Sequence, residues 1–341
     1  RNTVATRVNE NGLIEEVASN VPRLDYSDGG CPSLLLEPTA TNFAVYSEAI
    51  STSYSPNNLT QTPNYGISPD GNLTSTRVVL DNITDSRTSF NNTSLVNGTE
   101  YTFSAYYKGV IGQTTYIHFL SSAGGVNVSK EIVFNGQWQR ESITFTAGSA
   151  NNFTYIVDVR QGTSTATDFE VWGVQVEQNS YSTSYIKTIG TAQTRVADTA
   201  TGAGNASTFN SSEGVLMFEG SSLANDGTNR FISLTDGSND NRVLFGYRAS
   251  SNQVFARIEG NNSASFDLTN VVNDTKTVIK LAIYYDNLYN YKMYINGFLV
   301  DSAIGTDSII GLNTLDFTNA TGAENFYGSA KQIQYFDSAL N

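Results

Sequence analysis

"YTFSAYYKG", residues 101–109, alternates apolar and polar side chains along its length. One face of the extended chain would carry Tyr101, Phe103, Ala105 and Tyr107. A period of two is typical of a β-strand with one buried side. The pattern returns in "TDFEVWGVQVEQ", residues 167–178, where we expect Trp172, Val174 and Val176 to share a buried face. Both stretches predict strands of a β-sandwich.

The composition agrees with strands along most of the chain. The 341 residues include 19 Tyr and 18 Phe, and only 15% of them are charged. Aromatic residues suit the half-buried surface of a sheet. Because one domain usually takes about 100 to 200 residues, we expect two domains. The predicted fold is all-β, with two antiparallel β-sandwich (jelly-roll) domains preceded by an extended N-terminal segment.

Turn residues and one helical pattern refine this expectation. Asn135-Gly136 and Asn296-Gly297 each lie between apolar runs. Asn-Gly is the strongest short signal for a β-hairpin, because both residues accept a positive φ. Residues 9–20 suggest a short helix, and small residues replace the alternation over residues 188–207. The loss of alternation predicts a domain boundary there.

The predicted division of the chain has four parts. Residues 1–44 form an attachment segment, 45–190 a first sandwich, 191–208 a linker and 209–341 a second sandwich.

The first part contains a compact peptide, residues 23–42, which we expect to act as an extended clasp. Its apolar run would fill a groove, while Pro32 and Pro38 would limit the freedom of the unfolded peptide. The expected clasp residues are Cys31, Leu34, Leu35 and Leu36.

Charge and hydropathy narrow the classes of partner. The net charge of −13 and the pI near 4.5 speak against nucleic acid, whose phosphates attract clustered Lys and Arg. No apolar run approaches the roughly 18 residues that span a bilayer. We therefore expect a soluble chain without membrane insertion.

Several motifs resemble those of a known family. Residues 5–48 contain "ATRVN", "PRLDY", "CPSLLLEP" and "YSE", as in the lead-in of tailed-bacteriophage fibre and head-spike proteins. Residues 171–198, which end in "YSTSYIKTIGTAQTRVAD", are similar to the fibre domain of that family. Beyond about residue 209, "KMYINGFLVDS" and "GSAKQIQYFDSAL" resemble concanavalin A-like or laminin G-like sandwiches.

The resemblance implies a virion structural protein on the outside of a phage particle, as a head or tail fibre, a spike or a capsid decoration. The first sandwich would be a fibre domain like a carbohydrate-binding module. The implied partners are other virion proteins and host-surface or environmental glycans, with a homo-oligomer, commonly a trimer, as the assembly. A structural capsid ornament without glycan binding is the alternative, and a polysaccharide depolymerase is the third reading.

The residues offer little for catalysis. His118 is the only histidine and lies in a strand pattern, so we expect it to be structural rather than part of a triad or a zinc site. Glycoside hydrolysis needs only two carboxylates, but the acids of the second sandwich are isolated. Those of the first sandwich are expected to face solvent; they are Glu131, Glu141, Glu170 and Glu177. We expect no enzymatic activity.

Glycan binding needs aromatic faces that stack on sugar rings, with short polar side chains beside them. Aromatic residues also fill sandwich cores, so abundance alone decides nothing. Trp138 follows a predicted turn and is open to either interpretation, whereas the tyrosine candidates are expected to be exposed. The candidates are Trp138, Tyr247, Tyr284, Tyr289 and Tyr291.

Calcium is the only cofactor that the sequence suggests. The loops "SLANDGTN" and "LTDGSNDN" offer Asp226, Asp236 and Asp240, and hard cations prefer oxygen ligands. Neither loop follows the EF-hand spacing. Asp-Gly and Asn-Asp also form solvated turns without a metal.

Overall fold

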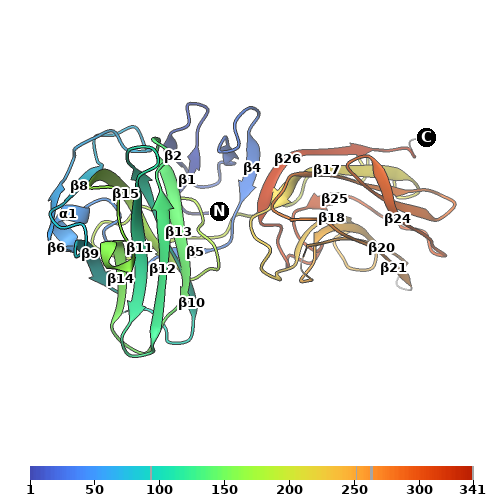
Figure 1. Cartoon of the computed structure of the whole chain (residues 1–341). Coiled ribbons are helices and arrows are strands. Elements are labelled where there is room, and N and C mark those ends of the chain that lie inside the picture. Colours follow the sequence, from blue (N-terminus) through green and yellow to red (C-terminus); the bar gives the residue numbers. More distant parts are fainter. Residues whose placement is uncertain (93, 251, 262–263, 340–341) are drawn as a thin grey trace. The chain divides into compact units, whose positions relative to one another are not determined.

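The computed structural model describes residues 1–92, 94–250, 252–261 and 264–339, and it is almost entirely β (Figure 1). The all-β prediction is confirmed. Two compact units are each assembled from separate stretches of the chain. We call Asn2–Val21 with Thr39–Val196 the N-terminal unit, and Arg1, Pro22–Pro38 and Ala197–Asn341 the C-terminal unit. Among the described residues, no helix has the length and hydropathy to cross a membrane.

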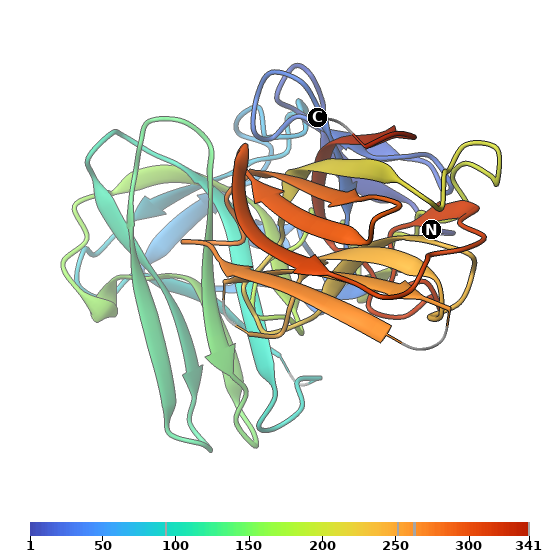
Figure 2. The ribbon, with the colours of Figure 1, turned by 90° about the vertical axis from the view of Figure 1, so that its right-hand side faces the viewer.

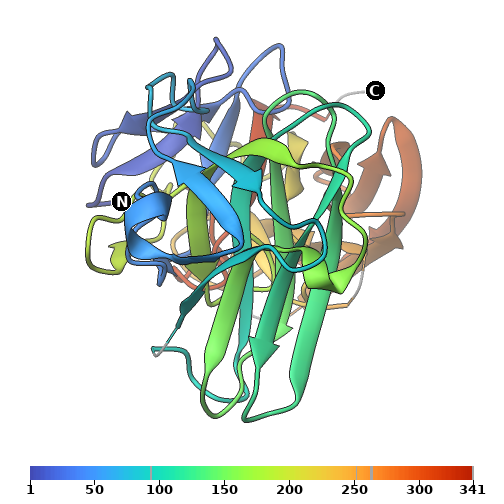
Figure 3. The ribbon, with the colours of Figure 1, turned by 60° about the vertical axis from the view of Figure 1, so that its left-hand side comes forward.

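The N-terminal unit is a sandwich of two five-stranded antiparallel sheets (Figure 3). One sheet has the order β13 (Gln139–Thr146), β10 (Glu100–Lys108), β15 (Asp168–Glu177), β8 (Thr76–Leu80) and β7 (Leu59–Thr62). The other has the order β12 (Val126–Val133), β11 (Thr114–Ser121), β14 (Asn152–Asp158), β9 (Arg87–Asn91) and β6 (Ser55–Asn57). Two short helical turns accompany them in the described part of the chain: α1 (Ile50–Ser53) and a 3-10 turn (Val159–Gln161).

The alternation in β10 is confirmed, because its four apolar residues all lie in the core between the two sheets. Trp172 is buried as predicted, but it does not share a face with Val174 and Val176. Gly173 has a φ of +67°, and the pairing of β15 with β10 shifts register there, which marks a β-bulge. The bulge turns Trp172 to the outer face, against Ile14 and Tyr185, while Val174 and Val176 stay in the core.

The turn at Asn135-Gly136 does not form the predicted hairpin. β12 pairs with β11 and β13 pairs with β10, so this turn carries the chain from one sheet to the other. Phe134, only 1% exposed, fills the corner before the turn. Its backbone N–H donates to the carbonyl of Gln113 at 2.9 Å. The turn chemistry was read correctly, but the partners of its flanking strands were not.

The N-terminal helix is also absent, because residues 5–17 form a hairpin of β1 (Ala5–Val8) and β2 (Ile14–Val17). The side-chain oxygen of Asn9 accepts the backbone N–H groups of Asn11 and Leu13. Such local bonds compete with a helix. The buried Ile14 and Val17 are three residues apart, which imitates one face of a helix.

The segment expected to be a linker contains structure. β16 (Gln193–Arg195) pairs with β5 (Ala40–Asn42) inside the N-terminal unit. The division between the units falls at residues 196–197, within the 191–208 segment.

The C-terminal unit is a second sandwich (Figure 2). Its seven-stranded sheet has the order β24 (Phe298–Ile304), β23 (Asn290–Ile295), β22 (Ile279–Tyr285), β17 (Gly214–Ser222), β26 (Gly328–Phe336), β4 (Ser33–Leu36) and β3 (Leu24–Asp25). The five-stranded sheet has the order β21 (Ala264–Val271), β20 (Gln253–Gly260), β19 (Arg242–Tyr247), β18 (Arg230–Thr235) and β25 (Thr314–Asp316). Asn296 and Gly297, at φ of +52° and +87°, join β23 to β24 as the predicted hairpin.

Residues 22–38 supply two strands at the edge of the seven-stranded sheet. From here on, the name clasp refers to residues 22–38 rather than to the predicted 23–42. β4 pairs with β26, and β3 pairs with β4. Leu36 is 4% exposed within the core of this sandwich, and Leu34 packs against that core. Leu35 is also buried, whereas Cys31 is exposed and adds little to the packing. Residues 39–42 of the predicted clasp belong to the N-terminal unit.

A buried charge cluster holds the clasp in place. Arg23 donates to the carboxylate of Glu37 at 2.6 Å and to that of Asp198. Asp198 also accepts the backbone N–H of Glu37 at 3.0 Å. Burial alone would lower the pKa of Arg23, but the two carboxylates raise it above its usual value. The guanidinium therefore stays charged and ties both ends of the clasp to residue 198.

Candidate functional site

Predicted tyrosines of the C-terminal unit gather around one turn, between β22 and β23. The carboxylate of Asp286 organises this turn by accepting the backbone N–H groups of Leu288 and Asn290, each at 2.9 Å. It also accepts the hydroxyl of Tyr284 at 2.9 Å. Burial alone would raise the pKa of Asp286, but these bonds and those of the Asn290 side chain hold it below its usual value. We call residues 284–291 the tyrosine turn.

Tyr289 has an unusual backbone within the tyrosine turn. Its φ of +61° is rare for a bulky residue. Its backbone N–H donates to the carbonyl of Asp286 at 3.0 Å, which helps to fix this conformation. The half-buried ring lines a cavity of about 200 Å³, formed by Ser211, Ser212, Tyr285, Asp286, Asn287, Tyr289, Tyr291, Ser308 and Ile309. Aromatic rings beside hydroxyl and amide groups suit a small polyhydroxylated ligand.

Two of the predicted tyrosines are not exposed as expected. Tyr247 is 3% and Tyr291 is 2% exposed, and both lie in the core of the C-terminal sandwich. The side chain of Tyr291 points into the core, on the same side of β23 as Met293 and Ile295. Only part of it therefore reaches the cavity wall. The side chains of Tyr247 and Phe245 on β19 both point into the core.

Trp138 belongs to the N-terminal unit and has no part in the tyrosine turn. Its indole N–H donates to the carbonyl of Ile67 at 2.9 Å. The half-buried ring packs with Trp172 and Tyr185 on the outer face of the first sheet. These contacts give Trp138 a packing role.

The three predicted calcium ligands have protein partners. Asp226 pairs with Arg230 at 2.8 Å, and Asp236 accepts the backbone N–H of Ser238 at 2.9 Å. The backbone N–H of Asp240 donates to the Ser238 hydroxyl at 3.1 Å. Among the described residues, no three His, Cys, Asp or Glu side chains group as a metal site would require. Calcium binding stays a prediction.

His118 lies in a buried polar cluster of the N-terminal unit. Its Nδ1 is 2.8 Å from the carboxylate of Asp158, and its Nε2 is 2.8 Å from the side-chain oxygen of Asn127. The ring also stacks on Tyr155. Both ring nitrogens are thus occupied, and neither is positioned to activate a Ser or Cys nucleophile.

Asp158 should make the stability of the N-terminal unit depend on pH. Burial alone would raise its pKa, but bonds from Arg160 and His118 lower it to about 2. This stabilisation is present above the ordinary pKa of an aspartate and is lost as pH falls through about 2. In the wild type, the free energy of unfolding should fall between pH 5 and pH 2 as Asp158 is protonated. We expect this fall to be smaller by roughly 2 kcal/mol in Asp158→Asn.

Urea unfolding at both pH values, followed by tryptophan fluorescence, measures this change, because both tryptophans lie in the N-terminal unit. The exposed Asp81→Asn is the control. Equal pH dependence in the two variants would contradict the role of Asp158.

The carboxylates of the N-terminal unit have structural partners. Glu177, expected to face solvent, is instead fully buried, where it accepts the backbone N–H of Thr183 at 3.0 Å. Burial raises the pKa of Glu177. Glu141 pairs with Lys130 at 2.8 Å.

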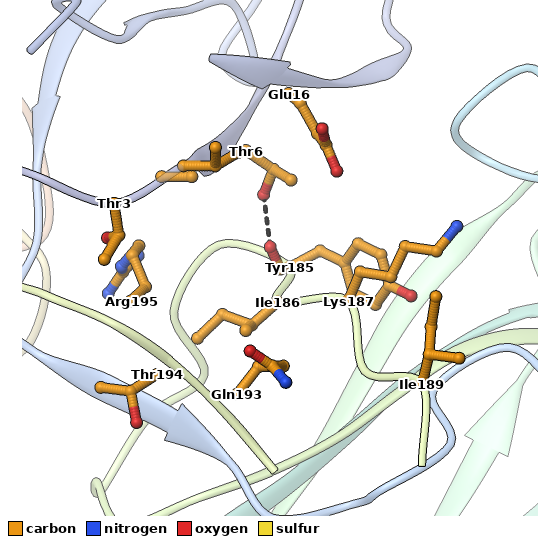
Figure 4. Close-up of a pocket in the computed structure, with 12 residues that line it drawn as sticks. Thr3, Thr6, Glu16, Tyr185, Ile186, Lys187, Ile189, Gln193, Thr194 and Arg195 are labelled. Carbon is orange, nitrogen blue, oxygen red and sulfur yellow. Dashed lines mark hydrogen bonds between the residues drawn. The ribbon is translucent and has the colours of Figure 1, made fainter. Parts of the chain in front are cut away.

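A cavity of about 440 Å³, larger than the one at the tyrosine turn, was not predicted (Figure 4). It lies in the N-terminal unit between the β1–β2 hairpin and residues 185–195. Its polar walls are already engaged: Thr6 donates to the carbonyl of Tyr185 at 2.6 Å, and Lys187 pairs with Glu48 at 2.9 Å. The tyrosine-turn cavity also has engaged polar groups, since the hydroxyls of Tyr285 and Tyr291 donate to the carbonyls of Asn210 and Asp307 at 2.7 and 3.0 Å.

The buried polar residues in the motifs of residues 5–48 and 171–198 include Arg23, Glu37, Asn42 and Asp198. Arg23, Glu37 and Asp198 form the clasp cluster. Asn42, 0% exposed, donates its amide to the carbonyls of Val174 and Ile186, at 3.1 and 2.9 Å. These four residues therefore contribute to the framework of the two units.

Comparison with known proteins gives distant likenesses only. No family model and no curated protein matches the chain. The tandem CBM22-1-CBM22-2 domains of Xyn10C from Paenibacillus barcinonensis align at 10% identity and a TM-score of 0.30, over 94% of this chain and 100% of that one. Mouse laminin α1 domains LG4-5 align at 10% identity and a TM-score of 0.29, over 76% and 89%. The heptameric SAP-like pentraxin from Limulus polyphemus aligns at 11% identity and a TM-score of 0.33, over 41% and 70%. Likenesses of this size assign no ligand.

Proposed function

We propose that this protein is displayed on the outside of a tailed-bacteriophage particle and adheres to host-surface or environmental glycans through its C-terminal unit. It would serve as a head or tail fibre, a spike or a capsid decoration, anchored to other virion proteins as a homo-oligomer. The virion role is supported by the motifs of residues 5–48 and 171–198.

The adhesive role is carried by the tyrosine turn. Tyr284 and Tyr289 come together there around Asp286, beside a cavity with hydroxyl and amide groups on its walls. An aromatic ring offers a flat apolar face to the C–H face of a sugar, and the polar groups can bond its hydroxyls. Adhesion needs no catalytic group, in keeping with the engaged state of His118.

The test is binding of the full chain to an array of bacterial capsular polysaccharides, O-antigens and exopolysaccharides. We expect saturable binding that Tyr289→Asn weakens about tenfold, or about 1.4 kcal/mol. Asn tolerates the positive φ at this position, so the variant removes the ring without straining the turn. Tyr65→Asn, at a tyrosine that is 49% exposed in the N-terminal unit, is the matched control.

Each outcome separates the readings. Absence of binding to the array and to the bacteria from which it was prepared would overturn adhesion and favour a capsid ornament. If Tyr289→Asn and Tyr65→Asn weaken binding equally, the glycan site does not lie at the tyrosine turn. Binding that a chelator abolishes and calcium restores would support the proposed calcium loops at Asp226, Asp236 and Asp240.

A further inference from the structure

The outer face of the seven-stranded sheet carries a row of apolar side chains that the sequence analysis did not identify. Leu281 and Ile283 of β22, with Leu216 of β17, point into the core. Residues between such inward positions must face the other way. The strand registers then align one outward residue from each of five adjacent strands: Gln334, Met217, Ala282, Tyr294 and Leu299.

A second row runs beside the first. The same registers align Phe336, Val215, Tyr284, Lys292 and Ser302. Four spacings between strands make each row about 19 Å long. Met217, Tyr294 and Phe336 are half-buried, and Leu299 is 53% exposed. We call the two rows the tyrosine stripe.

Polar groups border the tyrosine stripe. Glu219 and Lys280 form a pair on the next row, with the carboxylate 3.8 Å from the ammonium group. The ammonium group of Lys292 lies 4.6 Å from the centre of the Tyr284 ring. Lys292 has no carboxylate within ion-pair distance among the described residues, so it is available to bond a ligand. At the other border, the Tyr284 hydroxyl reaches Asp286 and joins the stripe to the tyrosine turn.

This combination fits a polysaccharide better than a second protein copy. Two rows of this length cover about 200 Å² of sheet. A stable protein interface needs about 800 Å² from each partner. A narrow track in which apolar and aromatic side chains are interspersed with the amide of Gln334, the ammonium group of Lys292 and the hydroxyl of Ser302 matches a sugar chain, whose rings have apolar faces and polar edges.

We propose that the tyrosine stripe binds a polysaccharide along its length, so that the protein recognises internal sugars of a long chain rather than only a chain end. This inference rests on the proposed glycan adhesion. The stripe on the outer face holds several sugars. The cavity of the tyrosine turn is lined by the inward-facing Tyr285 and Tyr291, and the bond from Tyr284 to Asp286 connects the two. Affinity therefore rises with the length of the glycan.

Tyr294→Ala in the full chain tests this proposal. The probe is the array polysaccharide that binds the wild type best, used intact and after mild acid hydrolysis to fragments of two or three sugars. We expect the variant to bind the intact polymer about tenfold more weakly and the short fragments as well as the wild type does. Tyr116→Ala is the control, because Tyr116 is a half-buried strand tyrosine of the N-terminal unit, bonded to Glu131.

The outcomes distinguish this proposal from the proposed function. If the wild type binds the polymer and Tyr294→Ala binds it equally well, the stripe is overturned while adhesion stands. If the wild type binds no glycan, both fail. Sedimentation of the same variants checks the competing occupant: an oligomer that Tyr294→Ala alone dissociates would assign the stripe to a second copy and overturn the proposal. Thermal melting ensures that both variants are folded.

Discussion

Arg23→Met is expected to destabilise the C-terminal unit by about 3 to 5 kcal/mol. The side chain of Arg23 is 0% exposed and neutralises the carboxylates of Glu37 and Asp198, whose side chains are 3% and 7% exposed. Methionine fills most of the volume but removes the guanidinium from both buried carboxylates, of which Asp198 also pairs with Arg1, at 3.3 Å. The expected loss of stability exceeds that of an ordinary surface ion pair, because both carboxylates stay desolvated after the guanidinium is removed.

Denaturant unfolding followed by circular dichroism measures this change. Arg77→Met is the matched control, because Arg77 pairs with Asp168 at 2.5 Å but both side chains are at least one third exposed. A surface pair of this kind contributes about 0 to 1 kcal/mol. If the two variants lose the same stability, the buried cluster does not hold the clasp.

Leu36→Ala is expected to cost about 2 to 5 kcal/mol, because it leaves a cavity in the core beside β26. Leu36 is 4% exposed, and its strand β4 lies between β26 and the edge strand β3. Besides a lower melting temperature, we therefore expect faster hydrogen exchange at Gly328 and Ala330, which pair with β4.

Leu24→Ala provides the comparison for Leu36, since Leu24 lies in the same clasp but is 43% exposed. We expect it to change stability by less than about 0.5 kcal/mol. A similar loss in both variants would mean that the clasp acts through its length and not through the anchoring of one side chain.

The sequence predicted strands better than it predicted which strands pair. The period of two in β10 needed no knowledge of the rest of the chain, because burial on one face is a local pattern. Asn135-Gly136 and Asn296-Gly297 show the limit. Both bend the chain sharply, but only the second joins neighbours in one sheet. The difference depends on which core each flanking strand enters, and no short window of sequence contains that information.

The site was partly predictable for the same reason. Tyr284 and Tyr289 were among the predicted candidates. The inward direction of the Tyr291 side chain depends on the register of β23. Tyr294 becomes a candidate only when the registers of five strands are combined. At Gly173 a β-bulge changes which side chains of β15 face the core. A lone glycine in a strand pattern suggests such a bulge, but it does not show which way the neighbouring tryptophan will turn.

The position of β4 has a consequence for how the chain is made. Its partner β26 follows it by about 290 residues, because Leu36 of β4 pairs with Gly328 of β26. During synthesis the clasp must wait for β26, with its three leucines uncovered, while the two stretches that flank it, Asn2–Val21 and Thr39–Val196, form the N-terminal unit. Pairing so distant in sequence slows folding. The nascent chain is therefore most vulnerable to wrong partners, including the clasps of neighbouring chains, until β26 emerges from the ribosome.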